Sequence, residues 1–175
     1  AVGWLNTAPN ALALGGPNSG NITIQGLGAT GFIDFNSNGG YAHVINAGSS
    51  ALSITSATGF SLNNAQISAG SVNLNSGGTI TLTGISAGNV SVTAAGNINS
   101  GSNGSATDIT ATGTVGLTAA GIGYQSLSYP YPTNRVGVSA GGAVTLTTTG
   151  LAGWRSAKTW TSTVIDVLPT FTTSA

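Results

Sequence analysis

The chain has 175 residues, 3% of them charged, and a formal net charge of zero. A nucleic-acid-binding protein needs clustered Lys and Arg to neutralise phosphates, so this composition argues against nucleic acid as a partner, and polybasic docking to a membrane fails for the same reason. No apolar run approaches about 18 residues, so we expect no transmembrane span. The absence of Cys leaves backbone ladders and packing, rather than disulfides, to stabilise the fold.

Residues 1–18 (AVGWLNTAPNALALGGPN) form an atypical first segment that contains Trp4, Leu5 and a Gly-Gly-Pro break. We expect this segment to cover or extend the first regular element, because the terminal repeats of stacked folds lack a neighbour on one face. The chain starts without the basic and apolar regions of a signal peptide, so we expect any such peptide to have been removed already.

The first clear strand is predicted at residues 19–26 (SGNITIQG), where Ile22 and Ile24 alternate with polar residues and therefore share one face. Residues 31–46 contain large aromatic side chains and the strong turn Asn-Ser-Asn-Gly-Gly, which predicts either a local hairpin or a wider coil of chain. His43 is the only histidine, and no partner stands at ligand spacing, so we interpret it as a polar residue beside the turn at Tyr41 and predict no metal site.

The regular body spans residues 47–122, in which short alternating strands are separated by Gly. The clearest apolar pairs are Val72/Leu74, Ile80/Leu82 and Val90/Val92. The Gly residues predict turns, since Gly adopts positive φ at low cost. Strands are predicted at 51–55, 60–64, 71–75, 79–83, 89–93, 108–112 and 114–118, and residues 101–107 are predicted to be a polar loop.

This repetition predicts an all-β parallel solenoid, in which each coil of chain stacks on the one before and the apolar pairs line a narrow core. Equivalent residues step by roughly twenty positions, from Leu52 to Val72 to Val90. An antiparallel meander or sandwich is the competing interpretation. The small and uniform core residues favour the solenoid, and frequent Gly and β-branched residues argue against helix.

An insertion is predicted at residues 123–139, where the run Tyr-Pro-Tyr-Pro indicates extended backbone. Solenoids carry such insertions as loops on one face, often the face that binds a ligand. The insertion therefore predicts either an aromatic, hydrogen-bonding platform for a sugar or a protein, or a loop packed on its own coil. The candidate contact residues are Tyr124, Tyr129, Tyr131 and Asn134, with Gln125 beside them.

The strand pattern returns at residues 140–150 and ends in a different segment at 151–175, so we divide the chain into an N-terminal cap or assembly segment (1–18), a solenoid body (19–150) and a C-terminal cap or assembly segment (151–175). Residues 161–168 are predicted to form a strand against the last coil. Large apolar side chains at both chain ends are candidates for contacts between copies of the protein: Trp4, Leu5, Trp154, Trp160 and Phe171.

No set of residues predicts catalysis, a metal or a cofactor. Asp34, Asp108 and Asp166 belong to dissimilar segments, whereas carbohydrate-cleaving solenoids need clustered carboxylates. Two arrays of alternating Thr residues, at 79–83 and 145–149, resemble those of ice-binding proteins, although Thr is also a favourable residue on an exposed strand. Outward Asn residues predict a further structural feature, in which Asn73, Asn75, Asn89, Asn97 and Asn99 stack on equivalent Asn residues one coil away.

The phrases SGGTITLTG, SAGNVSVTAAGNINSG and GTVGLTAAG resemble the repeats of filamentous-haemagglutinin-type adhesins, which are exported by two-partner secretion. The resemblance covers roughly residues 47–150. It implies a right-handed parallel β-helix at the surface of a Gram-negative bacterium, secreted and acting as an adhesin or as its stalk. The Asn-Pro-Asn-Leu and Asn-Pro-Asn-Gly motifs of the family's secretion domain do not occur; Ala-Pro-Asn-Ala (8–11) and Gly-Pro-Asn-Ser (16–19) are the nearest strings.

Two functional hypotheses follow, both non-enzymatic and extracellular. The first is a surface stalk or adhesin module that contacts a host protein or glycan through the insertion at 123–139. The second is a subunit of an extracellular filament or sheath, joined end to end through its terminal segments. Ice binding by a Thr array is a minor alternative. The near-absence of charge favours self-association, because it removes the repulsion that keeps copies of a protein apart.

Overall fold

The computed structural model describes residues 13–29, 31, 33–35, 43–101, 107–123, 136–148 and 170–173. In these ranges all regular secondary structure is β-strand, and every strand pairing is parallel. This part of the chain accordingly has no helix that is long and apolar enough to cross a membrane. The all-β, parallel prediction is confirmed, and the antiparallel alternative is excluded for these strands.

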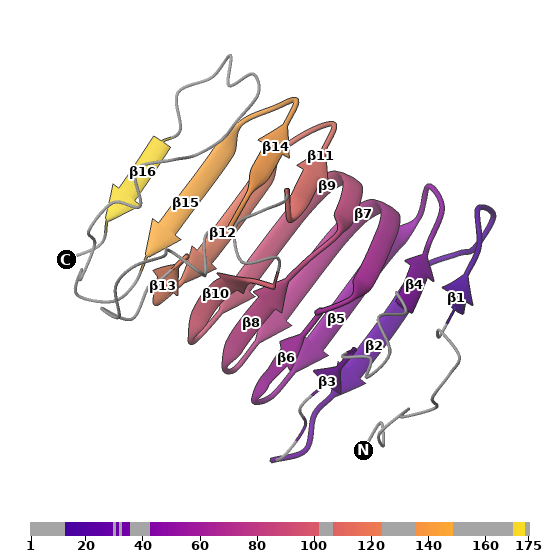
Figure 1. Ribbon diagram of the computed structural model, residues 1–175, viewed down its shortest axis with the longest axis horizontal. Coiled ribbons are helices and arrows are strands. Elements are labelled where there is room, and N and C mark those ends of the chain that lie inside the picture. The colour runs from indigo at the N-terminus through magenta and orange to yellow at the C-terminus, as the bar shows by residue number, and fades with distance from the viewer. Residues whose placement is uncertain are drawn as a thin grey trace.

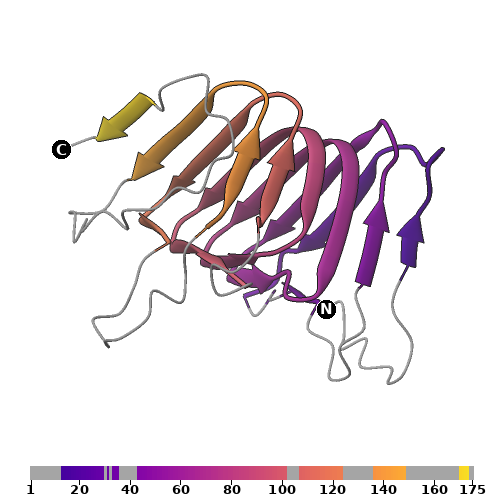
Figure 2. The same ribbon diagram turned by 45° about the horizontal axis from the view of Figure 1, so that its top comes forward.

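The larger sheet, here called sheet A, has 11 strands among the described residues and bends into two halves (Figures 1 and 2). Its first half contains β1 (Ala13–Gly15), β4 (His43–Asn46), the start of β7 (Ala65–Ser76), the start of β9 (Ile85–Ala94), β11 (Ile109–Ala111) and β14 (Val138–Ala140). Its second half contains β2 (Ile22–Gly26), β5 (Ala51–Ser56), the ends of β7 and β9, β12 (Val115–Ala119), β15 (Val144–Thr148) and β16 (Thr170–Thr173).

The smaller sheet, sheet B, is 5-stranded in the described part of the chain. It contains β3 (Ile33–Asp34), β6 (Gly59–Ser61), β8 (Thr79–Leu82), β10 (Asn97–Ser100) and β13 (Gly121–Ile122). The chain runs through the first half of sheet A, then its second half, then sheet B, and returns one step further along the stack (Figure 2). Each such circuit is one coil.

The register of the pairing confirms the predicted step along the chain, since Leu52 pairs with Val72 and Val72 pairs with Val90. It also bears on the two predictions for residues 31–46. Strand β3 pairs with β6 in sheet B, whereas β4 pairs with β1 and β7 in sheet A, so β3 and β4 do not form a hairpin with each other.

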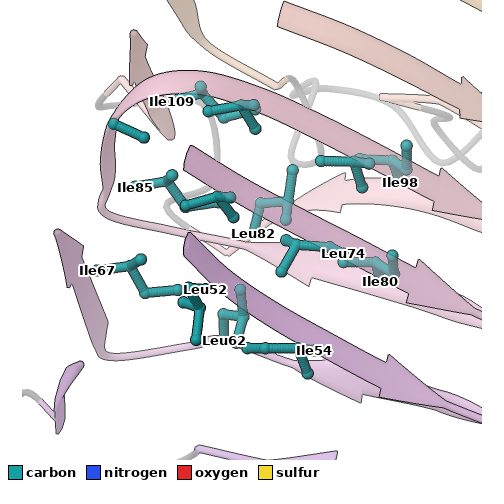
Figure 3. Packing of buried hydrophobic residues seen from close by; sticks show 14 of the residues in the cluster. Leu52, Ile54, Leu62, Ile67, Leu74, Ile80, Leu82, Ile85, Ile98 and Ile109 are labelled. Atoms are coloured by element: carbon teal, nitrogen blue, oxygen red, sulfur yellow. The ribbon is translucent and has the colours of Figure 1, made fainter. Parts of the chain in front are cut away.

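The core is a set of columns in which one apolar side chain lies beside its equivalent in the next coil (Figure 3). Ile67, Ile85 and Ile109 form one such column, and each is at most 2% exposed. Removing one of these side chains from water contributes about 1.5–3 kcal/mol. Further columns are Ile54/Leu74/Val92/Leu117 in sheet A and Phe60/Ile80/Ile98 in sheet B.

Several of the corner glycines are required for a reason that differs from the predicted one. Gly84 has a φ of 62°, as expected for a turn, but Gly70 and Gly88 are not among the residues with positive φ. A Cβ atom at Gly70 would lie 2.0 Å from the carbonyl oxygen of Ser49, and one at Gly88 would lie 2.3 Å from that of Gly70. Glycine is needed at the bend of sheet A because successive coils pack backbone on backbone.

Candidate functional site

Three long connections leave sheet B and return to sheet A at the same corner of the stack, here called the return corner. They join β3 to β4, β10 to β11 and β13 to β14, whereas the connection from β8 to β9 at this corner is short. Residues 36–42, 102–106 and 124–135 of these connections lie outside the described residues, but their flanking strands fix where each one leaves and rejoins the stack. The return corner is therefore the edge at which the three longer connections leave and rejoin the stack.

Asp108 lies at the return corner and its side chain is fully buried. The Ser100 hydroxyl donates a hydrogen bond of 2.9 Å to Oδ1, and the backbone N–H of Gly137 donates one of 2.8 Å to Oδ2. The main chain of Asp108 also bonds on both sides, because its N–H donates to the Gly137 carbonyl oxygen and its own carbonyl accepts from the Ile85 N–H, each at 2.9 Å. One residue thus connects three successive coils.

This carboxylate acts as an anchor for the long connections. Ser100 is the last residue of β10, where one connection begins, and Gly137 immediately precedes β14, where another ends. A buried carboxylate is costly unless hydrogen bonds replace its water, and both oxygens of Asp108 accept such bonds. The sequence predicted only the start of a strand here; the signal for a structural role was one carboxylate in a chain with three acidic residues.

The predicted ligand contacts Tyr124, Tyr129, Tyr131 and Asn134 lie outside the described residues, as does Gln125. They belong to the connection between β13 and β14 and so to the return corner. Their role as a binding platform remains a prediction.

The predicted assembly contacts Trp4, Leu5, Trp154 and Trp160 also lie outside the described residues, as does the strand predicted at 161–168. Phe171 lies on β16, which pairs with β15 so that Phe171 is in register with Leu146. Residues 13–15 of the predicted first segment form β1 and continue the stack.

A second candidate surface is the outer side of the second half of sheet A, here called the hydroxyl face. One column of outward positions holds Thr in three successive coils, namely Thr93, Thr118 and Thr147, and Thr172 of β16 is in register with Thr147. The neighbouring column holds Ser91, Gly116 and Thr145, and Thr170 is in register with Thr145. Adjacent coils are about 4.8 Å apart and alternate residues of a parallel strand about 6.6 Å apart, so these positions form a regular two-dimensional array.

The register separates the two Thr arrays predicted from the sequence. Thr79 and Thr81 lie on β8 in sheet B, whereas Thr145 and Thr147 lie on β15 in sheet A, so the two arrays do not share a face. Thr83 follows β8 and its hydroxyl donates a hydrogen bond to the carbonyl oxygen of Leu62 in the preceding coil. The column that does repeat was missed, because its members are unequally spaced in the sequence and only the pairing register aligns them.

The prediction of stacked Asn residues is wrong. Asn73 pairs with Ser53 and Ser91, so no Asn lies beside it in either neighbouring coil. Asn89 instead uses its Oδ1 to accept hydrogen bonds from the Thr114 backbone N–H at 2.8 Å and the Thr114 hydroxyl at 3.0 Å. Asn21 acts similarly toward the backbone N–H of Ala51 at 3.0 Å. These side chains satisfy a backbone N–H at the start of a strand in the next coil, since Ala51 is the first residue of β5 and Thr114 directly precedes β12.

The His43 side chain is buried, and its ring meets the ring of Phe35 edge to face with centroids 6.2 Å apart. Its backbone N–H donates to the carbonyl oxygen of Asn64 at 2.7 Å. In the described ranges no group of three or more His, Cys, Asp or Glu residues is arranged to hold a metal ion.

No protein-family model matches the chain, and comparison with curated proteins and with solved structures also gives no match. The resemblance to filamentous-haemagglutinin-type repeats therefore stays a prediction from the sequence phrases.

Proposed function

We propose that the protein is an extracellular, non-enzymatic stalk or adhesin module of a bacterial surface protein, built as a right-handed parallel β-helix. The observation that carries this proposal is the unbroken register of sheet A, in which the column Ile24, Ile54, Leu74, Val92, Leu117, Leu146 and Phe171 runs from β2 to β16. Such a stack grows in one direction by adding coils, which is the property that a stalk requires.

The right-handed coil is supported by a general rule of chain topology. Successive strands of each half of sheet A are parallel and are joined through the other half and sheet B. Connections between parallel strands of one sheet are right-handed in nearly all known cases. The sequence phrases that resemble adhesin repeats support the same hand.

Attachment is assigned to the connection between β13 and β14. It holds three of the four Tyr residues in an otherwise aromatic-poor chain, and it leaves the stack at the return corner, where Asp108 fixes its last residues through Gly137. Tyrosines supply a large amphipathic contact area, which suits a sugar or protein surface.

The test is the triple variant Tyr124→Ser/Tyr129→Ser/Tyr131→Ser, compared with the wild type for binding to a glycan array and to host-cell surfaces. We expect at least a tenfold loss of binding with an unchanged β-sheet circular dichroism spectrum. A matched control replaces residues 102–106, which belong to the neighbouring connection of the return corner, with Gly and Ser and should bind like the wild type. Unchanged binding by the Tyr variant would overturn this assignment, and a wild type that binds no surface would overturn adhesion.

A second candidate function, ice binding, is favoured by the Thr column of the hydroxyl face. A fixed array of hydroxyl and methyl groups without charge can hold water molecules in a regular arrangement, because each hydroxyl both donates and accepts. The measurement is the gap between the melting and freezing points of a single ice crystal. We expect a gap for the wild type and its loss in Thr118→Lys, with Thr81→Lys on sheet B as control. A wild type without any gap rules this candidate out.

A further inference from the structure

Among the described strands, those of the first coil form a level surface at one end of the stack. Among the described strands, β1, β2 and β3 each pair on one side only, with β4, β5 and β6 respectively, and all three belong to the same coil (Figure 1). At the opposite end the described strands stop at different levels, since sheet B ends at β13, the first half of sheet A one coil later at β14, and the second half later still at β16. The described strands are therefore arranged differently at the two ends of the stack.

The direction of the hydrogen bonds shows which backbone groups of β2 face outward from the stack. The Ala57 N–H donates to the carbonyl oxygen of Gly26 at 2.8 Å, so Gly26 bonds toward the second coil. Alternate residues of a parallel strand bond to opposite neighbours, so Ile24 and Ile22 also bond toward the second coil. Thr23 and Gln25 consequently direct their N–H and C=O groups toward the open edge.

The apolar side chains of the first coil are incompletely covered. Leu14, Ile22 and Ile24 are partly buried, whereas their equivalents in the second coil, Ile45, Leu52 and Ile54, are each 0% exposed. Leu27, directly after β2, is 66% exposed. Proteins commonly protect a strand edge with charge or Pro; β1 and β2 contain neither, and Asp34 of β3 is the one charged residue in the strands of this coil. Inside the stack, each pair of coils is joined by backbone hydrogen bonds and by contacts between apolar side chains. The first coil presents the same kinds of groups on its outer side, where no described strand pairs with them.

We propose that this surface docks against the first coil of a second copy around a two-fold axis, with β2 antiparallel to its counterpart. An axis through Ile24 lets Thr23 and Gln25 of one copy exchange backbone hydrogen bonds with Gln25 and Thr23 of the other. The described strands of the first coil lie at one level, so two copies of this coil can meet along all three strands. At the opposite end the first half of sheet A stops at β14, one coil before the second half, so the described strands there do not offer such a level surface. Zero net charge leaves no long-range repulsion between the copies.

The first experiment compares the wild type with Thr23→Pro and Thr23→Ala by light scattering during size exclusion, over a dilution series. Proline removes the N–H that faces the open edge and blocks pairing there, without removing a bond to β5. We expect a dimer for the wild type and for Thr23→Ala, and a monomer with unchanged circular dichroism for Thr23→Pro. A monomeric wild type, or a dimeric Thr23→Pro, would overturn the proposal.

The second experiment tests the two-fold arrangement and decides the matter if Thr23→Pro does not fold. In an antiparallel pair the facing residues 23 and 25 lie about 5.5 Å apart between Cα atoms, within the range of a disulfide. Because the chain has no Cys, the double variant Thr23→Cys/Gln25→Cys should give a covalent dimer on mild oxidation, whereas neither single variant should. Open-ended filaments, or an absence of crosslinks in the double variant, contradict the two-fold contact. Adhesion through the return corner is a separate property. Its test, the triple Tyr variant, is independent of the dimer experiments.

Discussion

Two neighbouring coils of the same stack differ in length but share one core. The coil from Ile67 to Ile85 closes at the return corner through residues 83–84, whereas the coil from Ile85 to Ile109 closes through 101–108. Ile67, Ile85 and Ile109 nevertheless stay in one buried column. The extra residues fall between β10 and β11 in the chain, and the longer coil adds a buried carboxylate, Asp108, directly before β11. The strands thus fix the register between coils. The corner tolerates additional residues when the polar groups buried there form hydrogen bonds.

The largest effect is expected from lengthening a strand by one residue. Inserting Ala between Val90 and Ser91 of β9 reverses the facing of every later side chain in that strand, so Val92 moves outward and Ser91 moves into the core. We expect the loss of the cooperative thermal transition followed by circular dichroism. The matched control inserts Ala between Thr83 and Gly84 at the short corner and should keep that transition. Equal behaviour of the two insertions would contradict the distinction between strand and corner.

An intermediate effect is expected from removing the anchor of the longer coil. Asp108→Ala leaves the Ser100 hydroxyl and the Gly137 N–H without this acceptor, and unsatisfied buried groups cost about 1–3 kcal/mol each. Asp108→Asn should cost less, because its amide oxygen can accept from Gly137 while its NH₂ group donates to Ser100. Urea unfolding measures both free energies, and an Asp108→Ala protein as stable as the wild type would show that the anchor is dispensable.

The smallest effect is expected from converting the short coil into a long one. Inserting Gly-Ser-Asn-Gly-Ser-Ala between Thr83 and Gly84 lengthens this corner from two residues to eight and adds only the entropy of a longer loop, about 1.2 kcal/mol. Urea unfolding should therefore give nearly the wild-type midpoint. A large loss of stability would mean that corner length is constrained even where no strand is altered.

The sequence predicted the inward side chains of the body well. Val72 and Leu74, Ile80 and Leu82 were expected to face the core, and all are buried. The alternation of apolar and polar residues shows which side chains of a strand share a face, because successive side chains point to opposite faces. The parallel pairing could also be predicted, from the step between Leu52, Val72 and Val90.

Other features needed the pairing register before they could be seen. The strand segments Ala65–Ala69 and Ile85–Ala87 escaped prediction, because each has a single Ile among its inward positions, the others being Ala, and the Gly of the bend separates them from the clearer pattern that follows. The Thr column and the Asp108 anchor are formed by residues far apart in the sequence. Which of them meet depends on the length of each corner, and the local pattern does not encode that length.

The axial direction of the backbone hydrogen bonds has a mechanical consequence. The described strands lie across the stack and bond to strands of neighbouring coils, so the bonds run along the length of the rod. Tension along this axis would load the bonds of an end coil first and peel it away before the next coil is strained. Such a rod would yield one coil at a time under force and lengthen in steps, absorbing work at each step instead of breaking at once.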